Sequence, residues 1–206
     1  MSKSPAAQTA AGGQEIATLR IELCDTEPMI WREVTIPVSI TLKTLHDIVQ
    51  VAMGWMDSHL WTFTIGNAEY GLPSGDDDWR DAPLINASTT ALPDILAPRK
   101  TKIQYLYDFG DSWEHALTIT GRRIGEPGQA YPCYAGGEQN APIDDCGGIP
   151  GFYESLDILA NPNHPEYEET RSWFGDYDPA IIDQRGIAAG LNKIAKRLQK
   201  TKKLAG

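Results

Sequence analysis

The fold is decided by the segment Ile16-Ala-Thr-Leu-Arg-Ile-Glu-Leu23 and by the segment that follows it, Ile30-Trp-Arg-Glu-Val-Thr-Ile36. Apolar and polar residues alternate in both segments, which is the pattern of a half-buried strand. Residues 25–28, Asp-Thr-Glu-Pro, have the composition of a turn. The sequence therefore predicts two strands joined by a turn, with Pro37 ending the second one.

A helix and a third strand are expected next. Thr41 is a good helix N-cap, and the residues after it place apolar side chains along one helical stripe until Gly54 stops the helix. Residues 60–65 then alternate again. The order strand, strand, helix, strand is how a β-grasp-like sheet begins, and we offer that likeness as an analogy.

The rest of the chain predicts further strands and then helices. Residues 72–100 hold several prolines and are expected to be irregular, whereas 102–107 and 115–120 alternate like strands. Residues 125–151 are expected to form a long Gly/Pro loop, and a loop of that length is often functional when it is ordered. An apolar stripe near the C-terminus, 187–198, predicts an amphipathic helix. We therefore expect an α+β fold with a mixed or antiparallel sheet and with helices at the C-terminal end.

Length and charge define the organisation of the chain. With 206 residues it fits one domain, for which we expect residues 15–198, flanked by a flexible tail (1–14) and a basic tail (199–206). The net charge is −10, but seven basic residues and no acid follow from Arg185 onward, which leaves 11 basic and 28 acidic residues before it. That body, with a net charge of −17, repels phosphate backbones, so nucleic acid is expected only at the basic C-terminal helix.

Other classes are disfavoured by simple counts. No segment approaches the roughly 18 apolar residues of a membrane span, so no membrane partner is expected. The N-terminus lacks the apolar stretch of a signal peptide. Three cysteines in a chain of this length do not suggest a disulfide scaffold, and a cytoplasmic location is the default expectation.

The most distinctive motif is Tyr107-Asp-Phe-Gly-Asp-Ser-Trp-Glu-His115. Gly110 between aspartates predicts a tight turn between strands, in which the carboxylates accept backbone N–H bonds. The functional interpretation is that the polar side chains line the mouth of a pocket. Alternation on the returning strand places Trp113 and His115 on one face and Glu114 on the other. The four polar residues of the motif, Asp108, Asp111, Glu114 and His115, therefore cannot all converge on one atom without a β-bulge.

Metal ligands are a second interpretation. Cys133 and Cys146 lie in the long loop, but they lack the close spacing of a zinc pair, so a zinc site would need a distant histidine. The neighbouring aspartates of that loop could bind a hard cation, without the spacing of a calcium loop. The low-odds metal ligands are His46, His115, Cys133 and Cys146. The candidate pocket comprises His46, His59, Asp108, Asp111, Trp113, Glu114, His115, Asp144 and Asp145.

Four segments together resemble the plasmid pRiA4b ORF-3-like family. They are Pro28-Met-Ile-Trp-Arg32 with Leu45-His46 downstream, Gly54-Trp-Met-Asp-Ser-His-Leu60, the 107–115 motif, and Pro142-Ile-Asp-Asp-Cys-Gly-Gly148. The family is largely uncharacterised, so the resemblance implies one fold over about 15–198 and little chemistry. Some members carry the label of transposon resolvase, which this acidic body does not support. Ala141 and Ile143 depart from the family's usual cysteine-proline-proline run.

These observations favour a non-enzymatic binding or interaction module, with an unidentified protein or small molecule as its partner. No complete catalytic constellation is present, such as a Gly-x-Ser-x-Gly elbow, and no cofactor is predicted. Two alternatives stay open. One is a metal-dependent enzyme or metal-binding protein with a site near the 107–115 turn. The other is a DNA-associated protein of mobile-element origin that uses the basic C-terminal helix.

Overall fold

A computed structural model describes residues 13–73, 83–96 and 102–205. Within them the chain forms an open, mostly antiparallel sheet, with the strand order β5-β4-β3-β6-β7-β1-β2-β8. Among the described strands, only β4 and β5 pair in parallel. The elements, in chain order, are β1 (Glu15–Leu23), β2 (Ile30–Pro37), α1 (Leu42–Met53), β3 (Trp61–Ile65), β4 (Ala68–Gly71), β5 (Ile85–Asn86), α2 (Leu92–Ile95), β6 (Lys102–Tyr107), β7 (Trp113–Ile124), β8 (Cys133–Glu138), α3 (Gly148–Leu159), α4 (Tyr167–Phe174) and α5 (Gln184–Ala205).

The first strands and helix form as their patterns predict. β1 pairs with β2, and its alternate side chains Leu19, Ile21 and Leu23 are fully buried. Thr41 caps α1 by accepting a hydrogen bond from the Thr44 N–H at 3.2 Å, which satisfies one of the free donors at a helix start. Gly54 ends α1 with a φ of +83°, a backbone conformation that glycine adopts without steric cost.

The sheet confirms the α+β class but not the β-grasp likeness. The chain order of β1, β2, α1 and β3 is as expected, whereas β6 and β7 separate β3 from β1 in the sheet. The likeness is therefore one of chain order alone.

Two segments contain more regular structure than expected. β8 lies in the long 125–151 segment and pairs with β2, while β4, β5 and α2 fall in or beside the proline-rich 72–100 region. β8 pairs with a strand far away in sequence, and β5 has only two residues, so local composition reveals neither of them. β4 is a four-residue strand that pairs with its neighbour β3. Predictions on 1–12, on 74–82 and on 97–101 lie outside the described residues.

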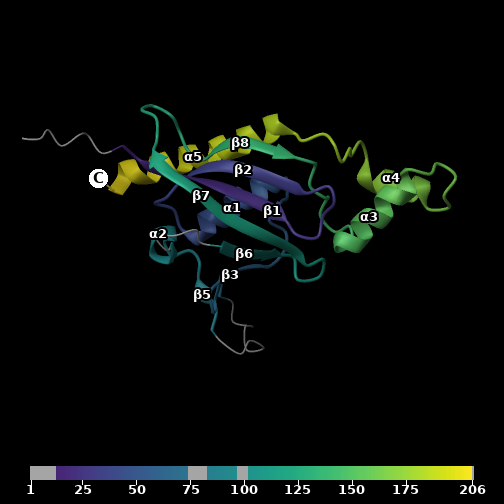
Figure 1. Cartoon of the computed structure of the whole chain (residues 1–206), viewed down its shortest axis with the longest axis horizontal. Coiled ribbons are helices and arrows are strands. Elements are labelled where there is room, and N and C mark those ends of the chain that lie inside the picture. The colour runs from purple at the N-terminus through teal and green to yellow at the C-terminus, as the bar shows by residue number, and fades with distance from the viewer. Residues whose placement is uncertain (1–12, 74–82, 97–101, 206) are drawn as a thin grey trace, which may run out of the picture.

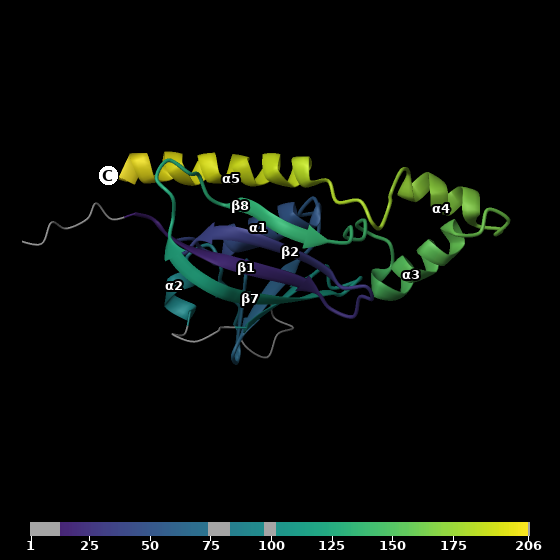
Figure 2. The same ribbon diagram turned by 45° about the horizontal axis from the view of Figure 1, so that its top comes forward.

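The helices occupy distinct places around the sheet. Helix α5 packs on α1 and β8 through its apolar stripe, in which Ile187, Leu191 and Ile194 are buried, and it continues past Leu198 into the segment expected to be a tail. Helices α3 and α4 project from one end of the sheet (Figures 1 and 2). No helix of the described residues is long and apolar enough to cross a membrane.

A buried arginine joins β2 to the ends of α1 and β8. Arg32 on β2 is 1% exposed and donates to four backbone carbonyls. They belong to Ala52 at 3.1 Å, Trp31 at 2.8 Å, Glu138 at 3.1 Å and Gln139 at 2.7 Å. Because a buried guanidinium needs its donors satisfied, Arg32 fixes the end of α1 against β2 and the end of β8, and thus the segments that follow α1 and β8.

Candidate functional site

Three segments meet at the end of the sheet where β6 turns into β7. They are the exit of α1 (54–60), the 108–112 turn and the 141–147 loop. The Asp108 N–H donates to the Leu60 carbonyl at 2.9 Å. The Trp55 indole N–H donates to the Pro142 carbonyl at 2.9 Å. These bonds bring residues from distant parts of the chain side by side.

Asp108 stabilises the turn through one carboxylate oxygen, while its other carboxylate oxygen takes no part in the turn. It is 8% exposed and has a φ of +56°, which is uncommon for a residue with a side chain. Its Oδ1 accepts from the Gly110 N–H at 2.9 Å, and its carbonyl accepts from the Ser112 N–H at 2.7 Å. The other carboxylate oxygen, Oδ2, lies 3.7 Å from His59 Nε2.

Asp145 approaches the same nitrogen of His59. Its Oδ1 lies 3.1 Å from His59 Nε2, and its backbone has a φ of +60°. One ligand atom from each of the three residues His59, Asp108 and Asp145 lies within 4.8 Å of the other two. Solvent exposure increases across the cluster: the side chains of Asp108, His59 and Asp145 are 11%, 27% and 58% exposed.

A third carboxylate lies beside this cluster. Asp144 Oδ2 accepts long hydrogen bonds from the Met56 N–H at 3.4 Å and the Tyr107 hydroxyl at 3.5 Å. Its Oδ1 is buried and has no hydrogen-bond partner among the described residues. Burial is the main reason that the pKa of the Asp144 carboxyl is raised, since a low dielectric disfavours its charged form.

His46 belongs to a different, closed network. Its ring is fully buried and stacks on Trp61, with 3.9 Å between ring centroids. His46 Nε2 lies 2.7 Å from Asp57 Oδ1, and its Nδ1 lies 2.8 Å from the Tyr105 hydroxyl. Gln50 donates to the same hydroxyl at 2.9 Å and accepts from the Asp57 N–H at 2.9 Å, which closes the ring of bonds.

This network defines the protonation of His46. A carboxylate only accepts, so Nε2 carries the proton that it donates to Asp57, and Nδ1 accepts from the Tyr105 hydroxyl. Burial lowers the pKa of His46 to about 4, with the nearby Lys43 ammonium adding to the effect. His46 is thus a neutral structural residue that holds the loop carrying His59.

The carboxylates near His46 already have cationic partners. Lys43 Nζ lies 2.7 Å from Asp47 Oδ1 and 3.2 Å from Asp57 Oδ2, and Arg197 also pairs with Asp47. No lysine or arginine among the described residues pairs with Asp108, Asp144 or Asp145. The described residues hold two groups of potential metal-ligand atoms, His46–Asp47–Asp57 and His59–Asp108–Asp145. Of these two, only the group around His59 has no lysine or arginine partner among the described residues.

The remaining predicted site residues lie elsewhere. His115 is 1% exposed, donates from Nδ1 to the Trp113 carbonyl at 2.9 Å and meets Trp55 edge-on. Burial lowers the pKa of His115 to about 4. Trp113 is fully buried beside it, while Glu114 faces the opposite, exposed side.

Asp111 and the cysteines have structural surroundings. Asp111 Oδ2 accepts from the Gly147 N–H at 3.1 Å, so it fixes the start of α3. Cys133 lies on β8, and Cys146 follows the cluster in the 141–147 loop; both are free thiols. Burial raises the pKa of Cys146 to about 12, and no cysteine joins a group of metal-ligand atoms in the described part of the chain.

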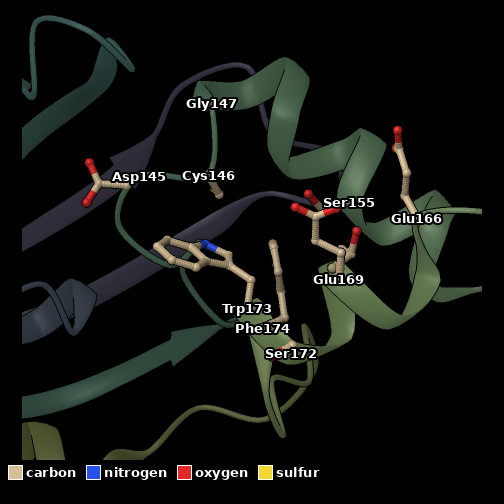
Figure 3. Close-up of a pocket in the computed structure, with 10 residues that line it drawn as sticks. Asp145, Cys146, Gly147, Ser155, Glu166, Glu169, Ser172, Trp173 and Phe174 are labelled. Carbon is tan, nitrogen blue, oxygen red and sulfur yellow. The ribbon is translucent and has the colours of Figure 1, made fainter.

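A pocket of about 720 Å³ opens next to the cluster, between the loop of Asp145 and the two projecting helices. In Figure 3, Asp145 and Trp173 lie toward one end of the pocket and Glu166 toward the other. It is lined by Asp145, Cys146, Gly147, Ser155, Glu166, Glu169, Thr170, Ser172, Trp173 and Phe174. The α4 residues of this pocket were not predicted from the sequence, because helical periodicity gives no sign of which helix an exposed face will meet.

These features define a mixed α+β protein with an open sheet and an imidazole–carboxylate cluster at one end of the sheet. The chain belongs to the plasmid pRiA4b ORF-3-like family, whose model matches residues 15–185. It is similar to the uncharacterized protein y4hQ of Sinorhizobium fredii, with 36% identity over 184 residues, which is 88% of this chain and 93% of that protein.

A solved structure shows the same architecture. The crystal structure of a protein of unknown function, MM3350 from Methanosarcina mazei, matches with a TM-score of 0.76 and 30% sequence identity. The match covers 84% of this chain and 97% of that one. Neither relative carries an assigned function in its name.

Proposed function

We propose that this protein binds a divalent metal ion through His59, Asp108 and Asp145. The observation that carries the proposal is the convergence of three ligand atoms within 4.8 Å of one another. Protein nitrogen and oxygen ligands lie about 2.0–2.6 Å from a bound divalent ion. Two ligands of one ion are therefore at most about 4–5 Å apart, and the observed spacing needs only small side-chain adjustments.

The charges support the same proposal. An imidazole nitrogen carries at most one N–H and so can donate to one carboxylate, yet two carboxylates face Nε2 of His59. Asp144 adds a third carboxylate, whose Oδ1 has no hydrogen-bond partner among the described residues. Even a protonated imidazole leaves the group negative, whereas a divalent cation compensates the charge.

The donor set indicates the class of metal. One imidazole and carboxylate oxygens suit Zn²⁺ or Mn²⁺ better than a thiolate-seeking ion. Three protein ligands also leave coordination positions open, as in metal sites that bind a water or a ligand. An ion at this place would present those positions toward solvent at the exposed Asp145, where it could hold a ligand or lower the pKa of a bound water.

Calorimetric titration of metal-free protein with Mn²⁺ and Zn²⁺ tests the proposal. We expect one equivalent to bind to the wild type, and at least about tenfold weaker binding to His59→Ala and Asp108→Asn. Asn keeps the oxygen that accepts from the Gly110 N–H, so the turn is preserved. His164→Ala is the matched control, because His164 lies between α3 and α4, outside the cluster.

The proposal is wrong if the wild type binds neither ion, or if His59→Ala binds as tightly as His164→Ala. In that case the function falls to the metal-free interaction module predicted from the sequence. The observation that favours such a module is the pocket beside the cluster, whose wall includes an exposed tryptophan.

A further inference from the structure

The pocket between the 145–147 loop, α3 and α4 has an acidic, aromatic lining. Three of its residues are carboxylates, namely Asp145, Glu166 and Glu169, and no lysine, arginine or histidine of the described residues lines it. Among the described residues, neither glutamate forms an ion pair. Its volume of about 720 Å³ is in the range of sites for small molecules.

The wall of the pocket contains an exposed tryptophan, Trp173. It is 60% exposed, although it lies at the end of α4 next to Phe174, which is only 6% exposed. A tryptophan left in solvent forgoes the stabilisation that burial would provide, and its indole is the aromatic ring that attracts cations most strongly. A carboxylate beside such a ring is the chemistry that recognises an ammonium group.

The arrangement suits a ligand with more than one positive charge. Glu166 lies toward the end of the pocket away from Trp173 (Figure 3), and Glu169 is a second glutamate of the lining. A linear polyamine can place ammonium groups near separate carboxylates while its methylene chain covers the indole. The strongly acidic body of the protein also attracts cations toward the pocket.

We propose that this pocket binds alkylammonium groups, with a linear polyamine as the ligand class. Binding stands on Glu166, Glu169 and Trp173, and these three residues lie outside the metal cluster. The site therefore goes beyond the proposed metal function and does not depend on it.

Calorimetry in metal-free buffer, with spermidine as the probe, tests this inference. We expect the wild type to bind spermidine, and Trp173→Ala and Glu166→Gln/Glu169→Gln to bind it about tenfold more weakly or worse. Glu154→Gln is the matched control, because Glu154 is an exposed acid on α3 that does not line the pocket. Added salt should weaken binding, since the attraction is between charges at a partly open site.

Three further arms separate the alternatives. A neutral diol of similar length should not bind, and equal binding of diol and spermidine would overturn the inference. A lysine-rich peptide that binds in a Trp173-dependent way, where spermidine does not, would identify the same ammonium chemistry on a protein partner. His59→Ala should bind spermidine like the wild type, so loss of metal binding and loss of polyamine binding are measured independently. Wild-type affinity in both pocket variants would refute the site.

Discussion

At the scale of single residues, His46 and His59 have opposite surroundings although both belong to the segment around Gly54. Every polar atom of the His46 ring has a partner, and burial keeps the ring neutral. His59 instead faces two carboxylates with the same nitrogen. The difference arises from Tyr105 and Asp108, which the chain brings in from β6 and its turn.

Trp113 and Trp173 allow the stability contributions of a buried and an exposed tryptophan to be compared. Trp113 is fully buried and Trp173 is 60% exposed. We expect Trp113→Ala to lower the free energy of unfolding by about 3–5 kcal/mol, because a large cavity remains in the core. Trp173→Ala should change it by less than about 1 kcal/mol.

Urea denaturation of both variants and of the wild type measures these changes. A small loss for Trp113→Ala would mean that the core around Trp55 and Tyr107 relaxes into the space. A large loss of unfolding free energy in Trp173→Ala would mean that the Trp173 ring stabilises α4 and is not simply exposed for ligand binding.

Sequence patterns predicted part of this residue-scale description. Strand alternation predicted that Trp113 and His115 share a face and that Glu114 faces the other side, and the burial of these residues confirms it. No pattern distinguished His59 from His46 as the histidine that meets Asp108 and Asp145. Such a meeting depends on segments that are 49 and 86 positions away in the chain.

At the scale of elements, the site depends on how the 141–147 loop enters α3. Gly148 has a φ of +67°, and a Cβ there would overlap the Asp111 carbonyl oxygen. Glycine is required at this position for both reasons, since positive φ strains other residues and the neighbouring atom is rigid backbone. The same loop carries Asp144 and Asp145.

We expect Gly148→Ala to destabilise the protein by at least about 1–3 kcal/mol and to weaken metal binding by displacing the loop. Gly128→Ala is the control, because Gly128 also has a positive φ, +82°, but nothing lies within 4 Å of its Cβ position. Gly128→Ala should lower the free energy of unfolding only by the strain of placing alanine at a positive φ. Denaturation and metal titration of both variants check this, and equal effects would contradict the role given to Asp111.

The C-terminal helix illustrates what element-scale patterns can predict. Its apolar stripe packs on α1 and β8, and its basic residues Lys193, Lys196 and Lys200 are exposed. The DNA-associated alternative therefore stays a prediction about this exposed face. Charge substitutions would test it better than deletion, because Leu191 and Ile194 are part of the core.

At the scale of the whole molecule, two buried histidines link stability to pH. Burial lowers the pKa of both His46 and His115 to about 4, below the 6.5 of an unfolded chain. Between these values the unfolded state binds more protons, so stability rises with pH across the window and is lost as pH falls from about 6.5 toward 4. Asp144, whose pKa burial raises, acts in the opposite direction.

We expect the free energy of unfolding to fall between pH 6.5 and pH 4, by up to about 1.4 kcal/mol for each unit that a histidine pKa is lowered. Denaturation curves across this range measure the fall. His115→Phe should make it shallower, because the variant loses one of the two groups while keeping an aromatic ring in the core. An unchanged slope in His115→Phe would show that His115 does not contribute.

The sequence by itself determined the α+β class, the bounds of α1 and β6, and which side chains of β1 and β7 are buried. These features follow from interactions between residues that are close in the chain, such as the Thr41 cap, the Gly54 stop and the alternation along a strand. Only the tertiary structure decided the strand order, the place of β8 and the meeting of His59 with Asp108 and Asp145. The distance in space between these segments cannot be read from their separation in the chain. It is set by long-range strand pairing and by the hydrogen bonds that Arg32 donates to carbonyls of α1 and β8.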